Sequence, residues 1–150
     1  MDIKQIDFDR VERVATEYSL TLPIEQTRQW AVYQATIEGR SPWQCIELVR
    51  GGRTMAVSSL MDFETHGYHF LRSEHGPVWV EEPSEALEAQ ALTVLCDYLR
   101  REHKAAVFIR LAVKHALDVT RPTLSTIPYD RTVILDVLPK IGRASCRERV

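Results

Sequence analysis

The chain has 150 residues, of which 45% are hydrophobic and 27% charged, a size and balance that fit one globular domain and exclude a disordered chain. Its net charge of −2 gives no overall basicity that would indicate nucleic-acid binding. No apolar run approaches the ~20 residues that cross a bilayer, and the first residues do not form a signal-peptide stretch. We therefore expect a cytoplasmic protein without an integral membrane segment. Peripheral association with the inner face of the cell membrane stays open.

Two helices are predicted first. Apolar residues recur at helical spacing over 8–18, and Asp7 can serve as the N-cap. A second helix is expected from Pro23 through about residue 37, with Thr21 as its cap. Gly39 would end it.

Three strands of an antiparallel meander are predicted next, over residues 43–49, 54–63 and 68–72. The turn residues Gly51-Gly52 and His66-Gly67 would join them.

The best helix signal begins at residues 82–85 and ends in a basic last turn at 100–104, an order that suits the helix dipole. Residues 105–111 form a strand too apolar for an edge, so we expect it to be central and covered on both faces. A loop is expected over 115–130 and a last strand over 131–137.

The final ten residues, 141–150, break this pattern. They resemble a translated short-read sequencing adapter, because the adapter-like DNA ATCGGAAGAGCGTCGTGTAGGGAAAGAGTG encodes them codon for codon. We therefore expect a non-native tail, to be set aside in reasoning about the fold. Removing its three Arg and one Glu changes the net charge from −2 to −4. Residues 1–140 would then be one incomplete domain.

This order of elements predicts an α/β fold of the α+β type, with a mixed, largely antiparallel sheet flanked by helices. The layout resembles that of an N-acetyltransferase (GNAT) domain, here truncated. Such a likeness does not by itself establish acetyl transfer.

Four segments, in order, resemble the FemA/FemB/FemX-type aminoacyltransferases. They are the Gln-x-x-x-Trp helix at Gln26 and Trp30, a third strand with its Gly-Pro-Val turn at 68–79, the strand after the long helix at 108–111, and the strand at 129–136.

This resemblance implies a function. Such enzymes transfer an amino acid from aminoacyl-tRNA to an amine of a peptidoglycan precursor peptide, which is lipid-linked or nucleotide-linked. The aminoacyl-tRNA is a co-substrate, and no other cofactor and no metal are implied. Because this chain would be the first of two domains, most tRNA contacts are expected in the missing domain, and the fragment is expected to be inactive.

The sequence departs from related patterns in three places. No Gly-rich turn of the type that holds the diphosphate of coenzyme A is present. Ala112-Val113 stands where members of the resembled family often carry an Asp-Pro pair. Gln34 stands near the position, just after the Trp of the first motif, where some members carry a lysine. Two alternatives therefore remain: an acyl-CoA N-acyltransferase of the same fold, and a docking module without chemistry.

Arg110 is the strongest candidate for a substrate contact, since a charge inside an apolar strand is unusual unless it is paired or faces a cleft. The alternative is a structural salt bridge with Asp62 or Glu64.

The loop formed by His75, Gly76 and Pro77 follows a strand end, where ligand-contacting loops are common. The alternative is a plain turn. Trp79 could form a wall of the substrate site, but core packing is the favoured interpretation.

No metal site and no complete catalytic set are predicted. The serines lack a nucleophile signature, no basic patch is evident, and neither the histidines nor the cysteines have metal-ligand spacing: His66, His69, His75, His103 and His115; Cys45, Cys96 and Cys146.

Overall fold

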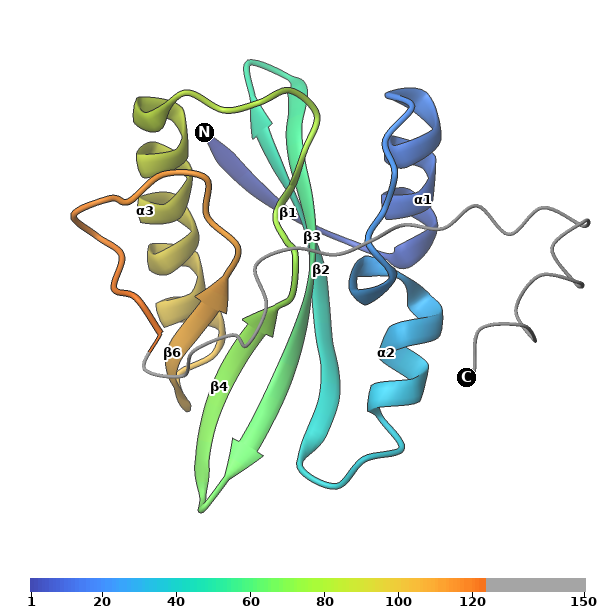
Figure 1. Cartoon of the computed structure of the whole chain (residues 1–150), viewed down its shortest axis with the longest axis vertical. Coiled ribbons are helices and arrows are strands. Elements are labelled where there is room, and N and C mark those ends of the chain that lie inside the picture. The colour runs from blue at the N-terminus through green and yellow to red at the C-terminus, as the bar shows by residue number, and fades with distance from the viewer. Residues whose placement is uncertain (124–150) are drawn as a thin grey trace, which may run out of the picture.

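One mixed sheet with helices on both faces forms the body of the molecule (Figure 1). The computed structural model describes residues 1–123. The strands are β1 (Asp2–Ile6), β2 (Arg40–Arg50), β3 (Arg53–Thr65), β4 (Tyr68–Ser73), β5 (Val78–Trp79) and β6 (Ala106–Leu111). The helices are α1 (Phe8–Glu17), the 3-10 helix η1 (Ile24–Gln26), α2 (Arg28–Gln34) and α3 (Glu85–Glu102).

The sheet follows the path β1-β2-β3-β4-β6, with β5 paired to β3. Every pair is antiparallel except β4 and β6, which run parallel. Helices α1 and α2 lie on one face and α3 lies on the other (Figure 1). The predicted α/β fold, with a mixed, largely antiparallel sheet flanked by helices, is therefore confirmed. The strand expected at 131–137 and the tail at 141–150 lie outside the described residues.

Helix α1 forms as its sequence predicts. The Asp7 carboxylate accepts a hydrogen bond from the Arg10 N–H at 2.8 Å, which satisfies one of the free donors of the first turn. Val11 and Val14 then pack on Cys45 and Val57 of the sheet.

The second predicted helix is wrong in its bounds and its cap. The chain forms η1 and then α2, which ends at Gln34 rather than near residue 37. Thr27, not Thr21, is the N-cap of α2, and its hydroxyl accepts the Trp30 N–H at 3.3 Å. The extended backbone of Thr27 ends η1, and the Thr27 side chain caps the N-terminus of α2.

Two short strands were not predicted. β1 pairs with β2 residue by residue, with Ile3 opposite Leu48, and β5 is only two residues long. Segments this short carry too few alternations to show a strand period.

Helix α3 covers the opposite face of the sheet. The Ser84 hydroxyl accepts the Leu87 N–H at 3.3 Å, so Ser84 serves as the N-cap. Leu95 and Leu99 pack on a core made by Ile46, Leu60 and Leu71.

Strand β6 differs from its prediction. Among residues 1–123, it is the outer strand of the sheet and pairs with β4. Val107 is 60% exposed and Phe108 is 46% exposed. The expectation of a central strand covered on both faces is therefore wrong for the described part of the chain.

Candidate functional site

The parallel pair of strands β4 and β6 places the candidate site. Helix α3 connects the two strands, so their carboxyl ends meet at one edge, where Ser73 lies opposite Leu111. Beyond this point the Gly76 carbonyl accepts the Ala112 N–H at 2.9 Å. Residues distant in sequence, His75-Gly76-Pro77 and Arg110, thus lie around the ends of two adjacent strands. Open sheets with such crossovers commonly bind ligands at these ends.

Gln26 anchors the turn that carries this loop. Its side chain is 1% exposed, and both ends of its amide are used. Nε2 donates to Ser73 Oγ at 3.0 Å and to the Glu74 carbonyl, and Oε1 accepts the Ser59 N–H at 2.7 Å. A buried amide with its hydrogen bonds made fixes one arrangement of its neighbours. η1 is thereby tied to β3 and to the end of β4.

Gly76 fits closely against this anchor. A Cβ atom at position 76 would clash with Ser73 Oγ and lie 2.8 Å from Gln26 Nε2. Ser73 Oγ itself lies 2.6 Å from Ser58 Oγ in a buried hydrogen bond. The peptide bond between Gly76 and Pro77 is cis. Because Gly76 packs this closely on Ser73 and Gln26, the predicted loop is a tightly packed turn above buried polar side chains.

His75 is the titratable side chain of the turn. Its side chain is 67% exposed, and Nε2 lies 3.8 Å from Glu25 Oε1. The His75 backbone is left-handed, with φ of 54°. An exposed imidazole beside a carboxylate can accept a proton from a substrate and keep the resulting charge near a negative partner.

Arg110 does not form the salt bridge that was the alternative interpretation. Asp62 instead lies within 3.2 Å of His69 Nδ1 and 3.0 Å of His103 Nε2. The Arg110 guanidinium lies 5.4 Å from the centre of the Phe70 ring and 5.5 Å from that of Phe108. These are cation–π distances, and within residues 1–123 no carboxylate forms a salt bridge with Arg110.

Trp79 belongs to the core. It is 9% exposed and clusters with Leu48, Ala56 and Ala91. Within residues 1–123 its buried indole N–H has no hydrogen-bond partner. Core packing, the favoured interpretation of Trp79, is correct, and the structure does not bring this side chain together with the turn and Arg110.

The start of α3 is acidic. Glu85 and Glu88 lie in its first turn, and the buried Glu88 carboxylate accepts the backbone N–H groups of Lys114 and His115 at 2.8 and 2.9 Å. His115 Nδ1 also lies 2.7 Å from Glu88 Oε2. These contacts tie the segment after β6 to α3. Carboxylates at a helix N-terminus oppose a diphosphate there.

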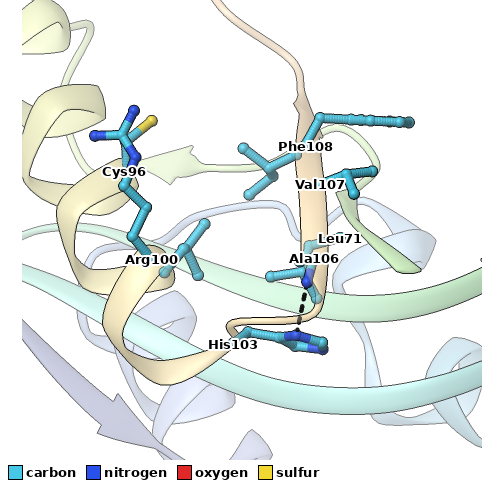
Figure 2. A pocket seen from close by; sticks show the side chains of 9 residues that line it. Leu71, Cys96, Arg100, His103, Ala106, Val107 and Phe108 are labelled. Carbon is cyan, nitrogen blue, oxygen red and sulfur yellow. Dashed lines mark hydrogen bonds between the residues drawn. The ribbon is translucent and has the colours of Figure 1, made fainter. Parts of the chain in front are cut away.

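A separate cavity of about 250 Å³ lies between the end of α3 and β6 (Figure 2). Its walls include the apolar Leu71, Leu99 and Ile109. Both ring nitrogens of His103 are occupied, Nδ1 by the Ala106 N–H at 3.2 Å and Nε2 by Asp62. Burial raises the pKa of the Cys96 thiol. Neither group is poised for catalysis, so the cavity is not the candidate site.

The residues that sequence reasoning missed are the buried or partly buried ones beneath the turn: Glu25, Gln26, Ser58 and Ser73. Gln26 stood inside the Gln-x-x-x-Trp motif, but nothing in the motif indicated its partners.

Among the described residues, no group of three His, Cys, Asp or Glu side chains could hold a metal ion. Within the same part of the chain, no helix is both long and apolar enough to cross a membrane.

No protein-family model matches the sequence, and no curated protein matches it. Among solved structures, the chain is similar to a GNAT family acetyltransferase from Staphylococcus aureus subsp. aureus USA300_TCH1516, with a TM-score of 0.46, 7% identity, and coverage of 83% of this chain and 98% of that chain.

Two further solved structures are similar. A ribosomal-protein-alanine N-acetyltransferase from Brucella melitensis biovar Abortus 2308 has a TM-score of 0.45 and 12% identity, over 84% of this chain and 100% of that chain. A probable acetyltransferase has a TM-score of 0.48 and 12% identity, over 89% of this chain and 99% of that chain. With TM-scores below 0.5, these likenesses carry no argument about activity.

Proposed function

We propose that this chain is an N-acyltransferase domain that binds its substrates at the carboxyl ends of β4 and β6. The observation that carries the proposal is the parallel β4–β6 pair with α3 as its crossover. The turn at 75–77 and Arg110 lie at the carboxyl ends of this pair, and in this proposal both would contact substrate. Ligands of open α/β sheets bind in such places.

In the proposed reaction an acceptor amine attacks the carbonyl carbon of an acyl ester or thioester. A C–N bond forms, the C–O or C–S bond breaks, and the amine loses a proton while the leaving group gains one. In this proposal His75 would accept the amine proton, and Glu25, 3.8 Å from Nε2, would stabilise the imidazolium. Arg110 would bind an anionic part of a substrate.

Two donor classes fit this reaction. An acyl-CoA donor would make the chain an acetyltransferase-like enzyme, and the three similar solved structures are described as acetyltransferases. An aminoacyl-tRNA donor with a peptidoglycan precursor peptide as acceptor is the second candidate. The acidic first turn of α3 favours the second, since the exposed Glu85 would oppose the diphosphate of coenzyme A at this helix N-terminus. A docking role without turnover is the third outcome of the test.

The test offers the full chain two sets of substrates. One set is acetyl-CoA with a panel of amines, and the measured quantity is the free thiol that the reaction releases. The other is tRNA charged with labelled amino acids, offered with a nucleotide-linked muropeptide and followed by mass spectrometry. In contrast to the sequence-based expectation of an inactive fragment, the proposal expects transfer with one donor. It also expects a loss of about 10²- to 10⁴-fold in His75→Ala, the range of general-base contributions.

Gln26→Ala should also lower the rate, because the turn loses its anchor. The matched control is Gln29→Ala, which removes an exposed amide from the neighbouring helix α2 and should leave the rate unchanged. No transfer from either donor, or equal rates for all three variants and the wild type, would overturn the proposal.

A further inference from the structure

A row of three phenylalanine rings crosses β3, β4 and β6. The rings of Phe63 and Phe70 stack with centroids 5.3 Å apart, and those of Phe70 and Phe108 stack at 4.8 Å. On β3, Phe63 is six residues from Val57, which packs against α1. Side chains an even number of residues apart share a face of a strand. The row therefore lies on the face that carries α1 and α2.

Three arginines accompany this row. The Arg40 guanidinium lies 5.2 Å from the centre of the Phe63 ring, and that of Arg72 lies 5.7 Å from the same centre. Arg110 lies over both Phe70 and Phe108. The only carboxylate bound to these arginines in residues 1–123 is that of Glu74, on Arg72. We call these six residues the Arg–Phe face.

The Arg–Phe face is not visible along the sequence, where no basic patch was evident. The three arginines come from the starts and ends of separate strands, and only strand pairing brings them together. Exposed aromatic surface continues beside them. Phe108 is 46% exposed and Tyr68, which precedes Phe70 by two positions on the same side of β4, is 63% exposed.

We propose that the Arg–Phe face binds a single-stranded nucleic-acid segment. Its phosphates would contact the guanidinium groups of Arg40, Arg72 and Arg110. Its bases would stack on Phe108 and Tyr68. A basic surface interleaved with exposed aromatic rings is the arrangement that binds single strands without strong sequence preference. Positive charge on the face complements a polyanion, whereas an apolar protein partner would have to bury all three guanidinium groups. The inference does not depend on acyl transfer.

The test measures fluorescence anisotropy of labelled oligonucleotides of about twelve nucleotides, a length within known single-strand site sizes, with the full chain and no acyl donor. Oligo-U and oligo-dT distinguish RNA from DNA, and a duplex of the same length is the comparison. Binding to single strands should weaken with salt at a log–log slope of about −2, as three phosphate contacts predict. The duplex should bind at least about tenfold more weakly, because its bases cannot stack on the rings.

Matched variants locate the contact. Phe108→Ala should weaken binding about fivefold or more, whereas Phe108→Tyr and Val107→Ala, a change at the adjacent exposed residue, should retain it. Arg110→Ala should weaken binding and reduce the salt slope by about 0.7, whereas Arg101→Ala, on the exposed end of α3, should not. Melting temperatures verify that each variant is folded.

Three results would overturn the proposal. The first is no salt-dependent binding of either oligonucleotide. The second is equal loss in Arg110→Ala and Arg101→Ala, which would indicate non-specific charge attraction. The third is a self-associating chain whose dimer is lost in Phe108→Ala without oligonucleotide binding, which would make the face a protein contact.

Discussion

At the scale of single residues, buried polar groups fix the geometry of the candidate site. Gln26 satisfies both ends of its amide against Ser73, Glu74 and Ser59. The sequence could indicate the turn at 75–77, because Gly and Pro are what turns require. It could not indicate the buried amide beneath the turn, because hydrogen-bond partners 33 and 47 residues away leave no local pattern.

Substitution of Gly76 tests the close packing of this turn. We expect Gly76→Ala to lower the free energy of unfolding by about 1–3 kcal/mol, the usual cost of overpacking, as measured by urea denaturation. Ser73→Ala removes the hydroxyl that the new methyl group would strike. The double variant should therefore lose less than the sum of the two single variants. Strictly additive losses would show that Gly76 and Ser73 do not meet.

A second buried polar group supports the sheet away from the site. Glu47, whose side chain is 6% exposed, accepts Arg10 Nη2 at 2.6 Å and the Thr54 hydroxyl at 2.6 Å. Burial alone would raise the pKa of Glu47, but the hydrogen bonds from Arg10 and Thr54 outweigh it and lower that pKa below its ordinary value of 4.5.

This pair predicts a pH dependence. A carboxylate with a lowered pKa in the folded state stabilises the fold above its ordinary pKa, and the contribution is lost as the pH falls through the lowered value. Arg10→Ala should cost about 2 kcal/mol of unfolding free energy at pH 7, and its difference from the wild type should shrink below about pH 4. Arg13→Ala, an exposed change on the same helix, is the control. A cost that does not change with pH would contradict the assignment.

At the scale of elements, segments with a clear period and a local cap or turn signal formed as predicted, whereas β1, β5 and the break between η1 and α2 were not predicted. Helices α1 and α3 and strands β2, β3 and β4 formed close to their predicted bounds, since caps, apolar stripes and Gly turns act locally. The break between η1 and α2 depended on one extended residue, Thr27. The position of β6 in the sheet depended on its partner strand β4. An apolar sequence is found both in central strands and in an outer strand such as β6, where the Phe108 ring stacks on Phe70 of β4.

The cap of α3 gives a prediction at this scale. Ser84→Ala should lower the free energy of unfolding by about 1 kcal/mol, because the Leu87 N–H loses its acceptor. Ser84→Asp, which keeps a side-chain acceptor, should restore most of that loss in the same thermal denaturation experiment. Equal stability of Ser84→Ala and the wild type would show that the cap contributes nothing.

At the scale of the whole molecule, the sheet brings together what the sequence separates. The fold class could be predicted from composition and periodicity, and the turn at 75–77 and Arg110 of the candidate site could be singled out because Gly, Pro and an unusual charge are visible along the chain. The Arg–Phe face could not, because Arg40, Arg72 and Arg110 become neighbours only through the registers of β2, β3, β4 and β6. Register depends on the partner strands as well as on the hydrophobic pattern.

The most direct test of the proposed site is to map donor binding by amide chemical shifts in the isotope-labelled full chain. Acetyl-CoA and an aminoacylated RNA minihelix would be titrated separately. We predict that one of them shifts the amides of Ser73, His75, Gly76, Arg110 and Ala112 together. Shifts confined to the α3–β6 cavity around Cys96 and Leu99, or no saturable shift with either donor, would contradict an acyl-transfer site at the ends of β4 and β6.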